Sequence, residues 1–536
     1  MKQKLKTYYP YIFLLLALCL LIILNLFFQD HWLDSDMAAE MIFSRLLAQE
    51  GHILASPDWC YSTEFRFLYT HLIMGPLFRI LNNWHAIRTI TNLVFYGLLL
   101  VSYFYFLKPL KVSPKAAVLT SLLLLLPFSE TMMLHMQIGN TYMSHVIILF
   151  FYFGMFLRLW NSHRKMTWKK ALLLFLYLAL SVVCGISGIR YLLALQCPLV
   201  LTAFLFCVRS TQFQELRRSP SRTRFFALLS GNSAVSFFYS LLGFAGSILG
   251  YGVNVLYISR HYSFQTYEST NFISIYDGVL LERLQNALGA LLMLFGYIPD
   301  RSVLSLRGLI SIISFLLFGL FIYCTVKCFR HTEGSSFFVV LFLITAFFVN
   351  CFAFVFTTST LVPRYYITVF IFVLPVLCFY FTKEELVFDK AVTALLLAGC
   401  LLLSTGKTVL SEITVDKNAA KRPVAEFLAE NGYHFGYATY NNANIITELT
   451  NGQVEIANIW DPENLNDFKW SSPMKYYEAD YHEGSVFLLL TQQEASAYQN
   501  AASVQNGQVI YEDDSYLVLL YDSVEVLKSY GASASS

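Results

Sequence analysis

The chain has 536 residues, of which 56% are hydrophobic, 17% aromatic and only 13% charged, whereas soluble domains carry about 25% charged residues. The apolar residues form nearly uncharged blocks of about 15–25 residues, the length that a helix needs to cross a bilayer. This pattern excludes a soluble enzyme, a disordered chain, a fibrous repeat and a β-barrel, whose strands are about 10 residues long. It predicts a polytopic α-helical membrane protein.

The net charge of +2 is unevenly distributed along the chain. Residues 411–536 contain 18 acidic and 6 basic side chains, a net of −12, which leaves +14 for residues 1–410. We therefore expect a basic membrane part followed by an acidic soluble part. The sequence has no basic run interleaved with aromatic residues, so we expect no nucleic-acid partner.

About eleven transmembrane helices are predicted. The first runs from about Tyr9 to Phe28, after three lysines. It is long for a signal peptide and no small-residue cleavage site follows it, so we interpret it as an uncleaved span with a cytoplasmic N-terminus. The other ten spans are expected near 86–107, 115–130, 141–160, 171–186, 189–208, 226–252, 306–326, 336–357, 364–382 and 389–406.

The positions of lysine and arginine support this count, because cytoplasmic loops are enriched in them. Basic clusters fall in alternate loops, around Lys111, Lys165, Arg218 and Arg330. The alternation holds if the segment 66–81 is an interfacial or re-entrant helix. If that segment crosses instead, the count becomes twelve and the basic loops lie outside, which the charges disfavour.

This topology predicts a transmembrane domain over residues 1–408, with large outer loops at 29–85 and 251–305. A soluble extracytoplasmic α/β domain is predicted over 409–530. Amphipathic and alternating patterns within it indicate one helix and five strands. The helix is expected over 420–430 and the strands over 433–440, 454–459, 486–490, 508–511 and 516–521.

A pair of carboxylates, Asp34 and Asp36, follows the first span. One interpretation is structural, with Asp36 capping an interfacial helix over 37–47. The other is functional, because a carboxylate held at the membrane surface can act as a general base. The two interpretations are compatible, since a capping carboxylate at an interface is also well placed for chemistry.

The segment resembles the acidic motif of the GT-C class of membrane glycosyltransferases, especially the bacterial RgtA/B/C/D-like and protein O-mannosyltransferase-like group. In that group the first span precedes a motif of the type Asp-Glu-small-hydrophobic. Residues 35–38 read Ser-Asp-Met-Ala, with Met37 in place of the Glu. The segment 61–72 resembles the second interfacial helix of the group; it keeps Glu64 but lacks the Lys-Pro-Pro that often follows. The resemblance is best over the first 110 residues.

The resemblance implies transfer of a sugar from a polyprenyl-phosphate donor, with inversion, to an acceptor hydroxyl. Asp36 would be the base, and Asp34 would orient the acceptor or share a divalent cation with Asp36. The sequence requires no cofactor, and whether a metal binds is left open. Hard oxygen ligands of this kind suit Mg²⁺ or Mn²⁺.

Arginines near the outer ends of the spans are the candidate ligands of the donor phosphate. Arg190 and Arg364 are each followed by a tyrosine, and Arg66 is a weaker candidate. The alternative is that these Arg–Tyr pairs anchor helices at the lipid headgroups. Further acceptor or donor contacts are expected from Glu64, Glu130 and His135. In the tail, aromatic residues such as Trp460 and Trp470 either contact a sugar at the surface or pack in the core.

The leading hypothesis is an extracytoplasmic glycosyltransferase that moves a hexose or pentose to a cell-envelope glycan, lipid or protein. A flippase or transporter of lipid-linked glycans is one alternative, although the predicted span interiors lack Asp, Glu and Lys. A non-catalytic membrane scaffold is the other. The sequence contains no Asn-x-Ser/Thr sequon, which favours a bacterial plasma membrane over the endoplasmic reticulum.

Overall fold

The computed structural model describes residues 2–162, 166–229, 231–265, 270–274, 276, 278–300, 302, 304–359, 361–383 and 387–532. Parts of the predicted second outer loop, 251–305, thus lie outside the described residues. The chain divides into two compact units. Unit 1 comprises Met1–Ile22, Val94–Leu256 and Glu268–Leu410, and unit 2 comprises Ile23–Leu93, Tyr257–Tyr267 and Ser411–Ser536. The domain boundary predicted at 408/409 stays a prediction.

Nine helices in the described part of the chain are long and apolar enough to cross a membrane, and two bent helix pairs raise the number to eleven. The predicted polytopic helical fold is confirmed. The nine helices, some with short extensions, are α1 (Lys2–Phe27), α4 (Trp84–Leu107) with η2 (Lys108–Leu110), α7 (Met143–Asn161), α8 (Trp168–Ile186), η4 (Leu192–Gln196) with α9 (Cys197–Arg209), α12 (Asn232–Val253) with η5 (Asn254–Ile258) and α13 (Ser259–His261), α15 (Leu306–His331), α16 (Gly334–Val355) and α19 (Val387–Thr414).

The two bent pairs break near prolines. Helix α5 (Pro114–Leu125) turns by 90° into α6 (Glu130–Met132) and η3 (Met133–Ile138). Leu126 takes an extended conformation, as a residue before proline tends to do, and Pro127 follows it. The second pair bends by 40°. It consists of η7 (Pro363–Tyr366) and α17 (Ile367–Phe370), followed by α18 (Val373–Lys383). Pro375 lies in the first turn of α18 and has no backbone N–H to donate to the preceding turn.

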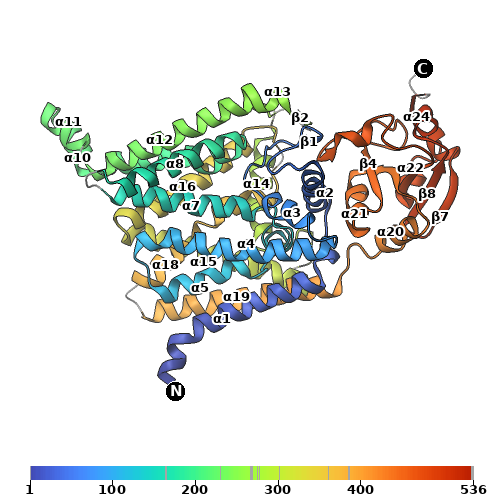
Figure 1. Cartoon of the computed structure of the whole chain (residues 1–536). Helices are drawn as coiled ribbons and strands as arrows, with labels where there is room; N and C mark the ends of the chain where they lie inside the picture. The colour runs from blue at the N-terminus through green and yellow to red at the C-terminus, as the bar shows by residue number, and fades with distance from the viewer. Residues whose placement is uncertain are drawn as a thin grey trace. The chain divides into compact units, whose positions relative to one another are not determined.

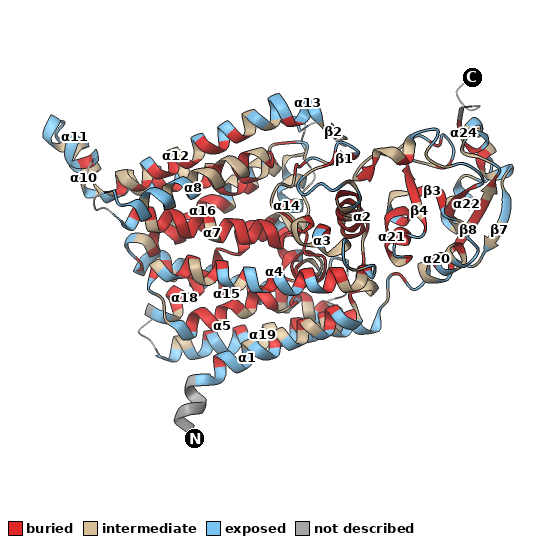
Figure 2. Cartoon of the chain, in the orientation of Figure 1, coloured by how far each residue is buried: buried red, intermediate tan, exposed pale blue. Residues whose placement is uncertain are grey.

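Burial separates the central helices of unit 1 from the peripheral ones. Figure 1 shows α7, α8 and α12 running alongside one another. In the most apolar stretch of α7, 89% of the residues are buried, against 22% in that of α8. Figure 2 shows the same contrast. Shorter helices complete the unit: α10 (Thr211–Arg218), α11 (Arg222–Leu229) and α14 (Leu280–Leu294).

Helices α8 and α12 touch backbone to backbone through small residues. A Cβ atom on Gly250 would lie 2.0 Å from the carbonyl oxygen of Val182, and one on Gly185 would lie 2.0 Å from that of Ser247. Small residues that let two helices approach closely are a general device for packing in membranes. The contact therefore depends on hydrogen as the side chain at these positions.

A five-stranded sheet forms the larger core of unit 2, with strand order β4-β3-β6-β8-β7. β4, β3 and β6 are parallel, whereas β6, β8 and β7 are antiparallel. The five predicted strands are confirmed, as is the predicted helix, now α20 (Lys421–Glu430). The strands are β3 (Phe435–Thr439), β4 (Glu455–Ile459), β6 (Val486–Thr491), β7 (Gln508–Glu512) and β8 (Tyr516–Tyr521).

The sheet buries apolar side chains on both faces. One face packs α20 and α21 (Tyr440–Leu449) against residues such as Phe487 and Val518. The other covers Leu488 and Leu519, with Leu527 packed against them. The remaining helices of this part are η8 (Met474–Tyr477), α22 (Gln492–Ala497), α23 (Ala502–Gln505) and α24 (Val524–Ala532).

The first outer loop belongs to the same unit as this sheet. It contains η1 (Gln29–Trp32), α2 (Ser35–Glu50) and α3 (His71–Phe78). A small sheet in the order β2-β1-β5 joins three distant segments. They are β2 (Ser263–Phe264), β1 (Trp59–Tyr61) and β5 (Ser472–Pro473). Unit 2 is therefore built from both ends of the chain.

The close contact at Gly250 can be tested by substitution, with Gly252 on the same helix as the matched control. Gly250→Ala should destabilise the protein by about 2 kcal/mol or more, because its new methyl group meets the backbone of α8. Gly252→Ala should stabilise it by up to about 1 kcal/mol through helix propensity, since a Cβ there has nothing within 4 Å. Thermal unfolding of the purified variants measures both. Equal behaviour of the two variants would contradict the packing described.

Candidate functional site

Asp34, rather than Asp36, is the N-cap of α2. Its backbone is extended and its carboxylate accepts a hydrogen bond from the amide of Met37 at 2.8 Å. The prediction that Asp36 caps a helix over 37–47 is therefore wrong, because the helix starts at Ser35. Asp36 lies in the first turn, where the helix dipole favours a negative charge.

Asp36 is half-buried and is held by a tyrosine from the C-terminal part of the chain. The hydroxyl of Tyr440 donates to Asp36 Oδ1 at 2.9 Å. The Ser35 hydroxyl in turn donates to the carbonyl of Tyr440 at 2.8 Å. Tyr440 is the first residue of α21, directly after β3. A carboxylate oriented in this way can accept a proton from a hydroxyl.

Glu40 lies one helical turn after Asp36 and is buried. It forms an ion pair with Arg66 and accepts a hydrogen bond from Thr70 at 3.3 Å. The Arg66 guanidinium also lies over the Tyr69 ring, 4.7 Å from its centroid. Arg66 is thus already engaged by a carboxylate, and its predicted role in phosphate binding stays a prediction. Sequence reasoning missed Glu40 as a partner, although its i+4 spacing from Asp36 was a usable signal.

His71, at the start of α3, is buried next to this ion pair. Neither ring nitrogen has a hydrogen-bond partner among the described residues, and the ring packs 5.4 Å from that of Phe43. Burial lowers the pKa of His71 to about 3, and the positive charge of Arg66 acts in the same direction. His71 is therefore a neutral imidazole at physiological pH.

A fully buried ion pair links the first turn of α2 to α21. Arg88 Nη2 lies 2.6 Å from each carboxylate oxygen of Glu448, and Arg88 Nε lies 3.0 Å from one of them. The same Nη2 donates to the carbonyl of Met37 at 3.0 Å. Burial raises the pKa of Glu448 to about 7, and the positive charge of Arg88 opposes a further rise. Nothing in the sequence marks Glu448 as a partner for Arg88.

Asp30, in η1, carries a second link between the two ends of the chain. Its carboxylate pairs with His85 at 2.9 Å, and its carbonyl accepts from the Asn418 side chain at 2.9 Å. Burial acts to raise the pKa of Asp30, but the hydrogen bond from His85 and the surrounding positive charges hold it below its usual value. Asp30 is therefore ionised at neutral pH.

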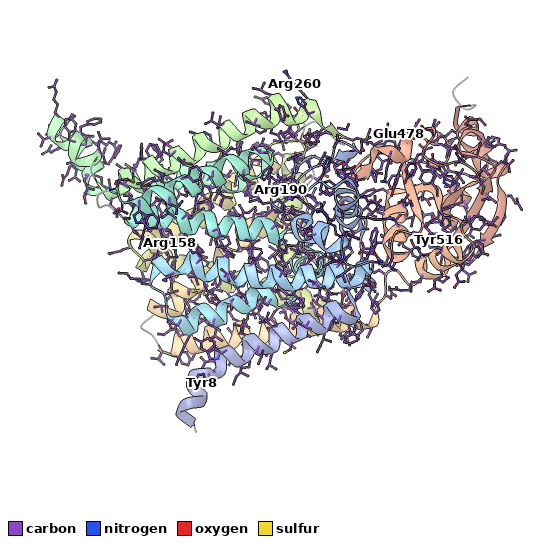
Figure 3. The ribbon with its side chains drawn as sticks, in the orientation of Figure 1. Tyr8, Arg158, Arg190, Arg260, Glu478 and Tyr516 are labelled. Carbon is purple, nitrogen blue, oxygen red and sulfur yellow. The ribbon has the colours of Figure 1, made fainter. Side chains whose placement is uncertain are left out.

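In unit 1, Arg190 is surrounded by tyrosines. It donates to the hydroxyl of Tyr142 and lies over the Tyr142 and Tyr365 rings, 4.9 and 5.5 Å from their centroids. Tyr365 directly follows the half-buried Arg364. The structure thus brings the two predicted Arg–Tyr segments together. Figure 3 shows Arg190 and Arg158 toward opposite ends of the helices of this unit.

Two histidines extend the tyrosine cluster of unit 1. His135 Nδ1 lies 2.7 Å from the Thr141 hydroxyl, and its ring is 5.7 Å from that of Tyr142. His145 Nδ1 lies 2.7 Å from the Tyr191 hydroxyl. His135 belongs to the π-helical segment η3, a conformation that occurs often at functional sites.

The two predicted glutamates differ in exposure. Glu64 is buried in the segment between β1 and α3. Glu130 is exposed and is the first residue of α6. In the described part of the chain, no group of three or more His, Cys, Asp or Glu side chains is arranged to hold a metal ion. The predicted roles of Glu64, Glu130 and His135, and of a cation at Asp34 and Asp36, stay predictions.

No protein-family model matches the chain, and no curated protein matches it in sequence. Among solved structures, ArnT from Cupriavidus metallidurans bound to undecaprenyl phosphate superposes with a TM-score of 0.56 at 12% identity, over 96% of this chain and 98% of ArnT. Apo ArnT gives 0.55 at 11% identity, over 98% and 99%. The chain has the GT-C fold. At 11–12% identity this likeness shows the fold alone.

The buried ion pair predicts a large cost when one partner is removed. Glu448→Gln should destabilise the protein by about 3–5 kcal/mol, because Arg88 is left buried with its charge uncompensated. The control is Arg422→Gln, whose partner Asp416 lies at 3.0 Å with both side chains partly exposed. That change should cost less than about 1 kcal/mol. Thermal unfolding distinguishes the two; comparable losses would argue against the buried pair.

His71 predicts a dependence of stability on pH. The unfolded chain binds a proton near pH 6.5, whereas the folded protein excludes it until about pH 3. Acid therefore favours the unfolded chain, and stability should fall as the pH drops below 6.5. Between pH 6.5 and 5 the contribution is about 2 kcal/mol. His71→Leu should remove this part of the slope, which unfolding measured across pH reveals; parallel curves for both proteins would refute it.

Proposed function

We propose that this protein is an extracytoplasmic, inverting glycosyltransferase that uses a polyprenyl-phosphate sugar. The observation that carries the proposal is a carboxylate, Asp36, held at the start of α2 by Tyr440 in a chain with the GT-C fold. ArnT from Cupriavidus metallidurans, a solved structure to which this chain is similar, has been obtained with undecaprenyl phosphate bound. In the proposed orientation the N-terminus is cytoplasmic and unit 2 lies outside the bacterial plasma membrane.

The reaction requires one base and a stabilised leaving group. A hydroxyl of the acceptor attacks the anomeric carbon, and its proton passes to the Asp36 carboxylate. The new bond joins the anomeric carbon to the acceptor oxygen, while the bond to the phosphate oxygen breaks on the opposite face. The products are the glycosylated acceptor and polyprenyl phosphate. Phosphate is a good leaving group, so no general acid is required.

Tyr440 is a positioning residue in this scheme. Its hydroxyl donates to one oxygen of Asp36, which fixes the carboxylate and directs its other oxygen. Asp34 maintains the helix start that presents Asp36. Both effects place the base without making contact with the reacting atoms.

Cationic side chains are proposed to stabilise the departing phosphate. Arg364 and Arg190 are the leading candidates, and Arg66 is the third. The tyrosines around Arg190 restrict its guanidinium to one region. The scheme requires no cofactor; a divalent cation bound to Asp34 and Asp36 would assist the same charge separation. The sugar is a hexose or a pentose, and the acceptor is a glycan, lipid or protein of the envelope.

Transfer from a panel of radiolabelled polyprenyl-phosphate sugars to native membrane acceptors tests the proposal. Asp36→Asn keeps the size of the side chain but cannot accept the proton, so transfer should fall by about 10²–10⁴-fold. Tyr440→Phe should lose about 10–100-fold, the value of a hydrogen bond to a charged group. Asp522→Asn, an exposed carboxylate of the same unit, serves as the control and should retain full activity.

Two outcomes would contradict the proposal. Undiminished transfer in Asp36→Asn would mean that another group, such as Glu64, Glu130 or His135, is the base. Binding of the donor without turnover by the wild-type protein, across a panel that a known transferase accepts, would favour a flippase or transporter. Folding of each variant is checked by thermal unfolding, so that lost activity is not mistaken for lost structure.

A further inference from the structure

A chain of aromatic rings leads from an exposed tryptophan to Asp36 within unit 2. Trp460 is 49% exposed, and its ring centroid lies 4.2 Å from that of Phe468. Phe468 is buried and meets the Tyr440 ring edge to face at 5.6 Å. The Tyr440 hydroxyl then donates to Asp36. The exposed indole and the carboxylate are thus connected through two rings.

The sheet topology explains why these rings meet. Tyr440 directly follows β3 and Trp460 directly follows β4. The two strands are parallel, and their last residues, Thr439 and Ile459, are paired in register. Both aromatic residues therefore leave the sheet at the same edge. The carboxyl edge of parallel strands is where α/β sheets bind ligands. Asp36 reaches this edge through its hydrogen bond with Tyr440.

Polar groups accompany the exposed indole. Asp461 follows Trp460 and accepts hydrogen bonds from the backbone and side chain of Asn464, at 2.8 and 3.1 Å. The Trp470 ring is parallel to the buried Phe468 ring, with centroids 6.5 Å apart. A flat apolar surface bordered by hydrogen-bonding side chains suits a pyranose, which has apolar C–H faces and a rim of hydroxyls. Aromatic rings with a polar neighbourhood are suited to such half-apolar partners.

We propose that Trp460 is the stacking platform for a sugar ring of the acceptor, and that the acceptor is therefore a glycan. This proposal rests on the proposed function and narrows its acceptor class. The ring that stacks on Trp460 anchors the glycan along the carboxyl edge of β3 and β4, which directs a hydroxyl of a neighbouring ring to Asp36. The net charge of −12 over residues 411–536 disfavours an anionic phospholipid headgroup as the acceptor.

Binding of neutral trisaccharides to the full-length protein in nanodiscs tests this directly. The probes are maltotriose, cellotriose and chitotriose, observed by saturation-transfer NMR and titrated to give a Kd. Wild-type protein should bind at least one of them. Trp460→Ala should raise that Kd about tenfold or more, as truncation of an aromatic anchor does. Trp460→Tyr, which keeps an aromatic face, should stay within about threefold of wild type.

The matched control is Tyr433→Ala. Tyr433 precedes β3 at the opposite edge of the parallel strands and packs on Phe427, with ring centroids 5.9 Å apart. Its removal also truncates a partly buried aromatic residue of unit 2, so it accounts for any general loss of stability. Its Kd for the trisaccharide should be unchanged. Thermal unfolding of both alanine variants shows whether each has folded.

The binding readout separates this inference from the glycosyltransferase proposal. Asp36→Asn should keep trisaccharide binding while losing transfer. If Trp460→Ala binds like wild type, or if none of the three trisaccharides binds, the glycan platform is refuted even where transfer depends on Asp36. If the platform binds but transfer survives in Asp36→Asn, the failure lies with the proposed base.

Discussion

The buried pair of Arg88 and Glu448 is the constraint on which unit 2 depends. Two charges can be buried away from water only when they pair with each other. Removing one partner leaves the other buried with its charge uncompensated, which destabilises the fold. Arg88 belongs to the N-terminal part of the chain and Glu448 to the C-terminal part. The pair therefore fixes α21 against the first turn of α2, since Arg88 also donates to the carbonyl of Met37. Residues some 360 positions apart are made one structural unit by this contact.

The arrangement of the proposed base follows from that constraint. With α21 held in place, its first residue, Tyr440, reaches Asp36. Asp34 provides the helix cap, so Asp36 is not required for capping and is presented in the first turn. One turn further along, Glu40 is neutralised by Arg66. Two acidic positions on one helix thus have different environments, one paired with an arginine and one oriented by a neutral hydroxyl.

Unit 1 is organised by different forces. Lipid does not drive helices together through the hydrophobic effect, so close backbone contact and prolines have more influence. Gly185 and Gly250 let α8 and α12 meet, and the bend after α5 occurs at Pro127. The guanidinium of Arg190 lies over the rings of Tyr142 and Tyr365.

The sequence by itself determined the membrane class, the approximate positions of most apolar helices and the strands of the tail, because hydropathy and periodicity are local properties of the chain. It also drew attention to Asp36 through a short motif after the first span. Only the tertiary structure decided that Asp34 is the cap, that Glu448 neutralises Arg88 and that Tyr440 orients Asp36. Each of these depends on which distant residues meet, and pairing between positions hundreds of residues apart leaves no periodic signal in one sequence.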